Sequence, residues 1–147
     1  MLTACRTLDQ PGWLSLREQL WPDGTREEHL AEMAEFLADR KRYAQFIEYD
    51  AAGEAIGFIE ISVRKDYVNG TQSSPVAFLE GIFVVPQARG SGVARRLVAE
   101  AEHWAKFMGC TEFASDAPID NTGSRAMHAA LGFVETERVV FFRKALR

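Results

Sequence analysis

Hydrophobic residues follow two different spacings along the chain, and these spacings predict where helices and strands lie. Apolar side chains recur at helical spacing over residues 13–21 and 30–37. Thr25-Arg26-Glu27-Glu28 fits a capping box, which marks the start of the second of these helices. More continuous apolar runs at residues 43–49 and 56–63 predict two strands joined by a turn.

The second half of the chain continues with strands and helices in alternation. The apolar run at residues 78–85 predicts a buried strand, which Pro86 ends because proline cannot donate to a sheet ladder. Helical spacing resumes over residues 93–105, and Gly109 is expected to cap that helix at its C-terminus. Residues 110–115 predict a further buried strand.

The last elements complete the predicted sheet. Asp120 is expected to cap a short helix that ends at Gly132. Residues 133–135 and 138–144 would then form the final strands, as a hairpin. The predicted fold class is α/β, or α+β, with a mixed and mostly antiparallel sheet that carries helices on both faces.

Length and composition describe an ordinary globular chain. Its 147 residues, 47% hydrophobic and 26% charged, predict one domain over residues 1–147. No apolar run approaches the ~20 residues that cross a bilayer, and no secretion signal is expected at the N-terminus. Cys5 and Cys110 lie far apart and outside any metal-type spacing, so two free thiols in a reducing cytoplasm are expected.

The net charge of −4 narrows the choice of partners. No basic patch is interleaved with aromatic residues, which argues against nucleic acid as the main partner. An acidic protein suits a cationic substrate through electrostatic steering. Many enzymes are acidic without such a reason, so the charge alone does not decide between functions.

The loop between Pro86 and the following helix is the strongest candidate for chemistry. Gly90 and Gly92 let a backbone approach phosphate oxygens, and a helix N-terminus favours negative charge. No Gly-Lys-Ser/Thr follows, which excludes a P-loop, and Arg95 stands where a dinucleotide fingerprint has its third glycine. Taken alone, the loop is equally consistent with an ordinary glycine turn before a helix.

The surrounding residues resemble a known superfamily. Gln87-x-x-Gly90-x-Gly92, after a strand ending Val-Val-Pro, resembles the pyrophosphate loop of the GNAT acetyltransferases. Asn121-x-x-Ser124, leading to Ala130-Leu131-Gly132-Phe133, resembles the next helix of that superfamily. The segments that resemble the type I aminoglycoside 6'-N-acetyltransferases are Leu16-Arg17-x-x-Leu20-Trp21-Pro22, Asp66-Tyr67-Val68-Asn69-Gly70, Ser73-Ser74-Pro75-Val76, Phe78-Leu79-Glu80-Gly81-Ile82-Phe83-Val84, Ala114-Ser115-Asp116, and Leu131-Gly132-Phe133-Val134-Glu135-Thr136-Glu137-Arg138.

This resemblance implies a GNAT fold, acetyl-CoA as co-substrate and no metal. It implies direct transfer of acetyl to the 6'-amine of an aminoglycoside in a ternary complex, which would give antibiotic resistance, and it implies a homodimer. An edge strand near residues 138–144 is a candidate for pairing between the two chains. The implied coenzyme-binding residues are Ile82, Phe83, Val84, Gln87, Arg89, Gly90, Ser91, Gly92, Val93, Ala94 and Asn121.

Two residues interrupt the predicted core strand at residues 78–85, and a third, polar residue ends the strand at residues 110–115. Gly81 predicts a bulge that exposes backbone groups, or else a gap left for a large neighbour. Glu80 is a candidate base or amine-binding carboxylate, with an ion pair to Arg64 as the structural alternative. Asp116, at the end of another strand, is a candidate for the same two roles, with turn initiation as its alternative.

The family resemblance adds substrate contacts and a candidate acid. Trp21, Tyr67 and Glu137 match positions that contact the aminoglycoside, together with Glu80 and Asp116. Aromatic walls suit sugar faces and ammonium groups. For Trp21 the alternative is core packing, and for Glu137 it is a solvated charge. His128 stands where many GNAT enzymes have a tyrosine that protonates the leaving thiolate, or it packs without a catalytic role.

Other functions remain open from the sequence. A GNAT enzyme acting on polyamines, peptide N-termini or another small amine would keep the coenzyme loop and the acidic residues. A non-catalytic acyl-CoA sensor would keep only the loop and leave Glu80 and Asp116 as structural charges. A nucleotide-binding module is the weakest alternative, since it lacks the expected lysine and third glycine.

Overall fold

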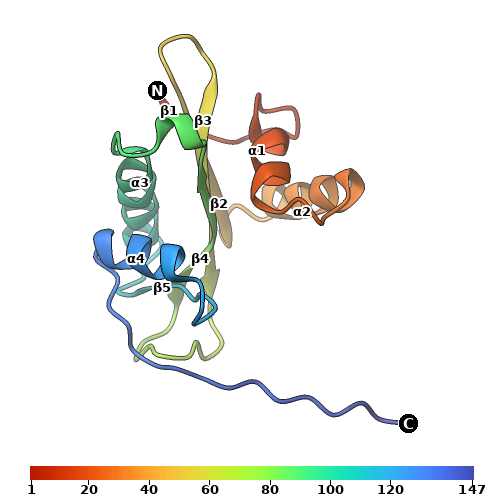
Figure 1. Cartoon of the computed structure of the whole chain (residues 1–147), viewed down its shortest axis with the longest axis vertical. Coiled ribbons are helices and arrows are strands. Elements are labelled where there is room, and N and C mark those ends of the chain that lie inside the picture. The colour runs from red at the N-terminus through yellow and green to blue at the C-terminus, as the bar shows by residue number, and fades with distance from the viewer.

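The computed structural model describes residues 1–147 and shows one mixed sheet flanked by helices (Figure 1). The sheet order is β1-β2-β3-β4-β5, with antiparallel pairing throughout except between β4 and β5, which are parallel. The elements are β1 (Leu2–Ala4), α1 (Trp13–Leu20), α2 (Arg26–Ala38), β2 (Tyr43–Tyr49), β3 (Ala55–Arg64), β4 (Val76–Val84), the 3-10 turn η1 (Pro86–Ala88), α3 (Val93–Phe107), β5 (Phe113–Ala114) and α4 (Thr122–Ala130). The predicted mixed, mostly antiparallel sheet is confirmed.

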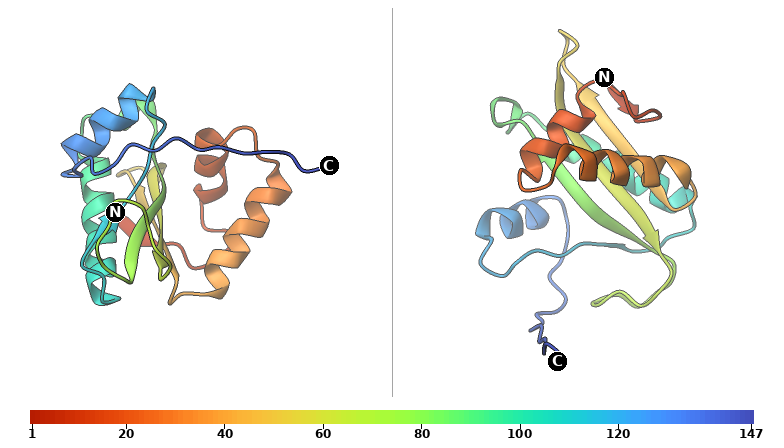
Figure 2. Two further views of the ribbon diagram at one scale, coloured as in Figure 1. Left: turned by 90° about the horizontal axis from the view of Figure 1, so that it is seen from below. Right: turned by 90° about the vertical axis from the view of Figure 1, so that its right-hand side faces the viewer.

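Helices cover both faces of this sheet, as predicted. In the right panel of Figure 2, α1 and α2 lie in front of the strands and α3 lies behind them. On the α3 side, Leu97 and Ala101 pack against Ile59 and Ile61 without exposure. On the α1–α2 side, Trp13 is also fully buried, in a cluster with Ile47 and Phe58. The sheet is therefore buried on both faces, which explains its near-continuous apolar strands. Every helix is too short or too polar to span a lipid bilayer.

Local signals fixed several helix ends. Thr25 and Glu28 form the predicted capping box, with each side chain bonded to the other residue's backbone N–H. Gly109 follows the end of α3 with a φ of 86°, as a C-terminal glycine should. Asp120 is wrong as a cap, because Asn121 accepts the Ser124 N–H at 3.0 Å instead.

A β-bulge confirms the interpretation of the glycine in β4. Glu60 pairs with Gly81, and the next residue, Ile61, pairs with Leu79, so Glu80 is the extra residue on β4. A side chain on Gly81 would also place its Cβ 2.4 Å from the ring of Trp21. Both interpretations of Gly81 therefore hold together, since it lies at a bulge and makes room for a large neighbour.

The predicted C-terminal hairpin is wrong. Residues 133–135 and 138–144 pair with no strand of the chain, and the segment runs away from the sheet as an extended tail (Figure 1). The neighbouring β5 is also shorter than predicted, since only Phe113 and Ala114 join the ladder. A strand needs a partner edge, and the tail's own chain provides none along its path. Val140, Phe141 and Phe142 are each more than three-quarters exposed as a result.

Candidate active site

The loop between β4 and α3 presents a row of unused backbone donors. Gly90 and Gly92 have φ angles of 82° and 86°, which turn the chain sharply into α3. The first amide of this region that donates inside the protein is that of Arg96, to the carbonyl of Gly92. The N–H groups of residues 90–95 therefore have no internal acceptor, and at Gly90 even an added Cβ would meet no atom within 4 Å. This arrangement fits a diphosphate group.

Side chains around the loop hold its shape. Arg89 donates from Nε to the Val84 carbonyl at 2.9 Å, and the Ser91 hydroxyl donates to the Ala88 carbonyl at 2.6 Å. Arg96 forms a double contact with Glu48 on β2, at 2.9 and 2.7 Å, and this lowers the pKa of Glu48. This ion pair anchors the start of α3 to β2. The sequence did not predict it, because Arg96 and Glu48 lie in separate elements.

The predicted coenzyme-binding strand has a free edge. β5 pairs with β4 only at Ala77 and Phe78, so the later residues of β4 have no neighbour on that side. Ile82, Phe83 and Val84 are half-buried there, although Arg89 already occupies the Val84 carbonyl. Of the remaining predicted coenzyme-binding residues, Gln87 is exposed on η1, and the side-chain oxygen of Asn121 caps α4. Val93 and Ala94 begin α3, where Val93 is buried and Ala94 is half-buried.

Glu80 lies in the bulge and is bonded by two neighbours on β3. Ser62 donates its hydroxyl to Glu80 Oε1 at 2.6 Å, and Arg64 donates to the same oxygen at 2.9 Å. The structural alternative, an ion pair with Arg64, is therefore what the protein contains. The second carboxylate oxygen remains free, and the side chain is 28% exposed, so a role toward an amine stays a prediction.

Asp116 differs from Glu80 in having no partner. It is exposed just beyond β5 and makes no side-chain hydrogen bond or ion pair. The turn-forming hydrogen bond expected of a structural aspartate is absent. Phe78 pairs with Ala114 at the end of the parallel ladder, so Glu80 and Asp116 each lie two residues beyond it, where the two strands part.

His128 on α4 is held at both ring nitrogens. Its Nδ1 lies 2.7 Å from the Ser124 carbonyl oxygen, so Nδ1 carries a proton and donates it. Its Nε2 lies 2.7 Å from the hydroxyl of Ser115, which comes directly before Asp116. In the neutral ring Nε2 accepts that hydroxyl proton, so only the imidazolium form could donate from Nε2. Ser115 belongs to the resembling segment Ala114-Ser115-Asp116, but the sequence predicts no role for it.

The other three predicted substrate contacts come from different segments. Trp21, just beyond α1, packs its ring over Gly81 beside Glu80 and edge-on to Phe58, with centroids 6.2 Å apart. Tyr67, in the loop after β3, is 75% exposed. Glu137 is exposed on the tail without a partner, next to Thr136, which lies against Gly70 of the same loop.

The structure also shows the contacts of three carboxylates to which the sequence assigned no role. Glu112 accepts from the Gln72 N–H at 2.9 Å and from the Ser73 hydroxyl, which anchors the 64–75 loop and lowers the pKa of Glu112. Glu135 pairs with Arg138. Glu60 is buried against Arg17, and its burial raises its pKa while Arg17 opposes that shift. Like Glu80, Glu60 interrupts an apolar strand, and this was the signal that could have revealed it.

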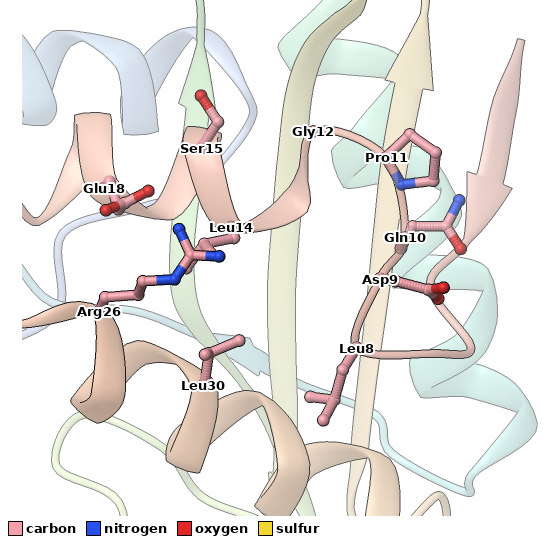
Figure 3. A pocket seen from close by; sticks show the side chains of 10 residues that line it. All are labelled: Leu8, Asp9, Gln10, Pro11, Gly12, Leu14, Ser15, Glu18, Arg26 and Leu30. Atoms are coloured by element: carbon pink, nitrogen blue, oxygen red, sulfur yellow. The ribbon is translucent and has the colours of Figure 1, made fainter.

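A hollow of about 490 Å³ lies elsewhere, between the first turns of α1 and α2 and the loop before α1 (Figure 3). Figure 3 shows Glu18 and Arg26 on its helical side and Asp9 on the loop side. None of the predicted coenzyme-binding or substrate-binding residues lines it. It is therefore not part of the candidate active site.

Known proteins resemble the chain over nearly its whole length. Residues 12–133 match the model of the acetyltransferase (GNAT) family. The aminoglycoside N(6')-acetyltransferase type 1 of Serratia marcescens is 50% identical, over 99% of both chains. The crystal structure of AAC(6')-Ih from Acinetobacter baumannii superposes with a TM-score of 0.93 at 50% identity, over 100% of this chain and 99% of the other. AAC(6')-Iy in complex with the bisubstrate analogue CoA-S-monomethyl-acetylneamine gives a TM-score of 0.92 at 47% identity, over 99% and 98%.

Proposed function

Because the chain belongs to the GNAT acetyltransferase family, and within it to the type 1 aminoglycoside N(6')-acetyltransferases, we propose that it acetylates the 6'-amine of aminoglycoside antibiotics with acetyl-CoA. Acetylation removes a positive charge from the drug, and so confers resistance. The whole of residues 1–147 would serve as one acetyltransferase domain. Both cysteines are free and buried, as suits a reducing compartment, which supports a cytoplasmic location.

The observation that carries this proposal is the row of free amides at residues 90–95 beside the unpaired edge of β4. The loop and the N-terminus of α3 would bind the diphosphate of acetyl-CoA. The open edge over Ile82, Phe83 and Val84 would hold the pantetheine arm through backbone groups. The thioester would then end near the bulge, where Glu80 and Asp116 lie.

The carboxylates and aromatic residues would then receive the amine. Asp116, with no internal partner, would bind an ammonium group of the drug, and Trp21, Tyr67 and Glu137 would line the sugar rings. The free oxygen of Glu80 would take the proton that the 6'-ammonium must lose, directly or through water. The amine nitrogen then attacks the thioester carbon, the C–S bond breaks, and the nitrogen loses its second proton to become the amide. The leaving thiolate takes a proton from the imidazolium form of His128, which that second proton would restore.

The test is thiol release from acetyl-CoA with a panel of amines. The panel contains kanamycin, tobramycin, paromomycin, which has a 6'-hydroxyl, spermidine and a short peptide. Release with kanamycin and tobramycin, but not paromomycin, is the expected result. Release with spermidine or the peptide alone would point to another GNAT substrate, and no release despite acetyl-CoA binding would support a sensor; either would overturn the proposal.

We also propose that the enzyme is a homodimer built through its tail. Residues Val139 to Phe142 are 50–92% exposed, and their unbroken apolar run suits a strand covered on both faces. This run would pair beside the free edge of β5 in a second copy, and the second tail would do the same in return. The double variant Phe141→Asp, Phe142→Asp should elute as a monomer in gel filtration with light scattering, whereas a monomeric wild type would contradict the dimer.

A further inference from the structure

A group of charged side chains lies fully buried on the α1–α2 side of the sheet. Arg17 on α1 has no exposed surface and Glu60 on β3 is 1% exposed. Arg17 Nη1 contacts both carboxylate oxygens of Glu60, and Trp13 donates its indole N–H to the same group at 2.8 Å. None of these three residues has a part in the mechanism proposed above. Since apolar residues of similar volume usually stabilise a core at least as well, a buried ion pair raises the question of a role beyond stability.

The network continues from Arg17 to the backbone of Trp21. Arg17 Nε donates to His29 Nδ1 at 3.3 Å. A guanidinium can only donate, so Nδ1 carries the lone pair and the proton of His29 is on Nε2. Nε2 then donates to the Trp21 carbonyl oxygen at 3.1 Å. His29 is 3% exposed, so water offers little alternative to this bond. The Arg17 guanidinium also lies 4.9 Å from the centre of the Trp21 ring, within range of a cation–π contact.

Both ends of the network meet at the bulge in β4. Glu60 pairs through its backbone with Gly81, and the Trp21 ring lies on the same glycine. The contacts therefore form a closed circuit from Glu60 through Arg17, His29 and Trp21 back to the bulge. Glu80, the extra residue of that bulge, is the predicted proton acceptor.

Trp21 needs such a support because it lies outside the regular part of α1. It is the C-cap residue, with φ −125° and ψ 73°, and Pro22 follows it. Helical geometry therefore does not set the direction of its side chain. Contacts with Phe58 on β3, with Arg17 and with His29 on α2 do so.

We propose that His29 is a positioning residue for the amine substrate: Arg17 fixes its tautomer with the proton on Nε2, and this N–H holds Trp21 over the bulge. This inference deepens the proposed function and rests on it, since it takes the Trp21 ring as a wall of the substrate site. The network includes none of residues 90–95, whose amides would bind acetyl-CoA, so that binding should not depend on it.

The test compares three substitutions of His29 with a matched control. Glutamine carries its amide nitrogen near the position of Nε2, whereas asparagine carries it near Nδ1 and alanine has none. We expect His29→Ala and His29→Asn to raise the KM for kanamycin about tenfold, the effect of losing one buried hydrogen bond, with the KM for acetyl-CoA within about twofold of wild type. His29→Gln should restore most of the loss, and His103→Ala, an exposed histidine on α3, should have no effect.

A readout without turnover separates this inference from the proposed function. Acrylamide should quench tryptophan fluorescence more in His29→Asn than in wild type and His29→Gln. Trp13 is buried, and Trp104, half-buried on α3, makes no contact with the network, so only Trp21 loses its hold. If the wild type acetylates no aminoglycoside, the proposed function fails, and the quenching still decides whether His29 holds Trp21. Equal behaviour of the glutamine and asparagine variants, or a parallel rise in both KM values, would overturn the inference.

Discussion

The two sides of the candidate active site hold their ligands in different ways. The loop after β4 offers backbone N–H groups, and the residues that shape it lie between Val84 and Arg96, apart from Glu48 on β2. The opposite side depends on side chains from α1, the bulge, the 64–75 loop, the end of β5 and the tail. A backbone site is sensitive to the shape of the chain, whereas a side-chain site is sensitive to charge and to the positions of distant segments. Substitutions on the two sides should therefore affect different substrates.

The largest effect is expected from Gly90→Val. A β-branched residue is strained at a φ of 82°, and its side chain would stand where a phosphate must approach. We expect the Kd for acetyl-CoA, measured by calorimetry, to rise about 100-fold. Gly53→Val is the matched control, because Gly53 has a φ of 84° and equally open surroundings in the β2–β3 turn. An equal loss of affinity in both variants would mean that strain alone, and not the phosphate site, explains the effect.

The next largest effect is expected from the two carboxylates. Glu80→Gln removes the proton acceptor, and we expect kcat with kanamycin to fall about 10- to 100-fold. Asp116→Asn removes an ammonium partner, so its main effect should be a higher KM for the drug. Glu54→Gln, an exposed glutamate in the β2–β3 turn, is the control for loss of a surface charge. Near-normal kinetics in both site variants would leave Glu80 as a partner of Arg64 only.

A smaller effect is expected from the Ser115–His128 pair. Because these side chains share one hydrogen bond of 2.7 Å, they should act as a unit. We expect Ser115→Ala and His128→Gln each to lower kcat about tenfold without changing KM, and the double variant to lower it little further. Additive losses would show that the two residues act separately, and an unchanged kcat would remove the acid role of His128.

The smallest effect is expected from Glu112, the anchor of the 64–75 loop. Hydrogen bonds from Ser73 and Gln72 lower the pKa of Glu112, so its anchoring is complete above the unfolded-state pKa and is lost as pH falls through the lowered folded-state value. Anchoring thus persists at neutral pH and weakens only in acid. Glu112→Gln mimics the protonated form, and it should raise the KM for kanamycin about two- to threefold at pH 7. If Glu112→Gln changed the KM for acetyl-CoA more than the KM for kanamycin, Glu112 would support the coenzyme side of the site instead of the amine side.

The same contrast explains how much the sequence predicted. The glycine loop, the capping box at Thr25 and the bulge at Gly81 depend on neighbouring residues, and the structure contains all three. The circuit through Arg17 and His29 joins residues from α1, α2 and β3, so no local pattern could mark it. The tail was predicted as a hairpin because its apolar run identifies a strand but not the edge that pairs with it.

The site residues show the same division. Glu80 was found because a carboxylate in an apolar strand is costly without a reason, and Glu60 satisfied that criterion equally well. Only the fold separates them, since it buries Glu60 against Arg17 and leaves Glu80 with a free oxygen near the parting of β4 and β5. The sequence pattern alone cannot distinguish a buried structural glutamate from one that is open to a substrate.

The most direct test of the two-sided site is calorimetric titration of acetyl-CoA into the double variant Glu80→Gln, Asp116→Asn. We expect a Kd within about twofold of wild type, because the free amides of residues 90–95 are untouched. A loss of acetyl-CoA affinity comparable to that of Gly90→Val would contradict it, since the carboxylates would then belong to the coenzyme side.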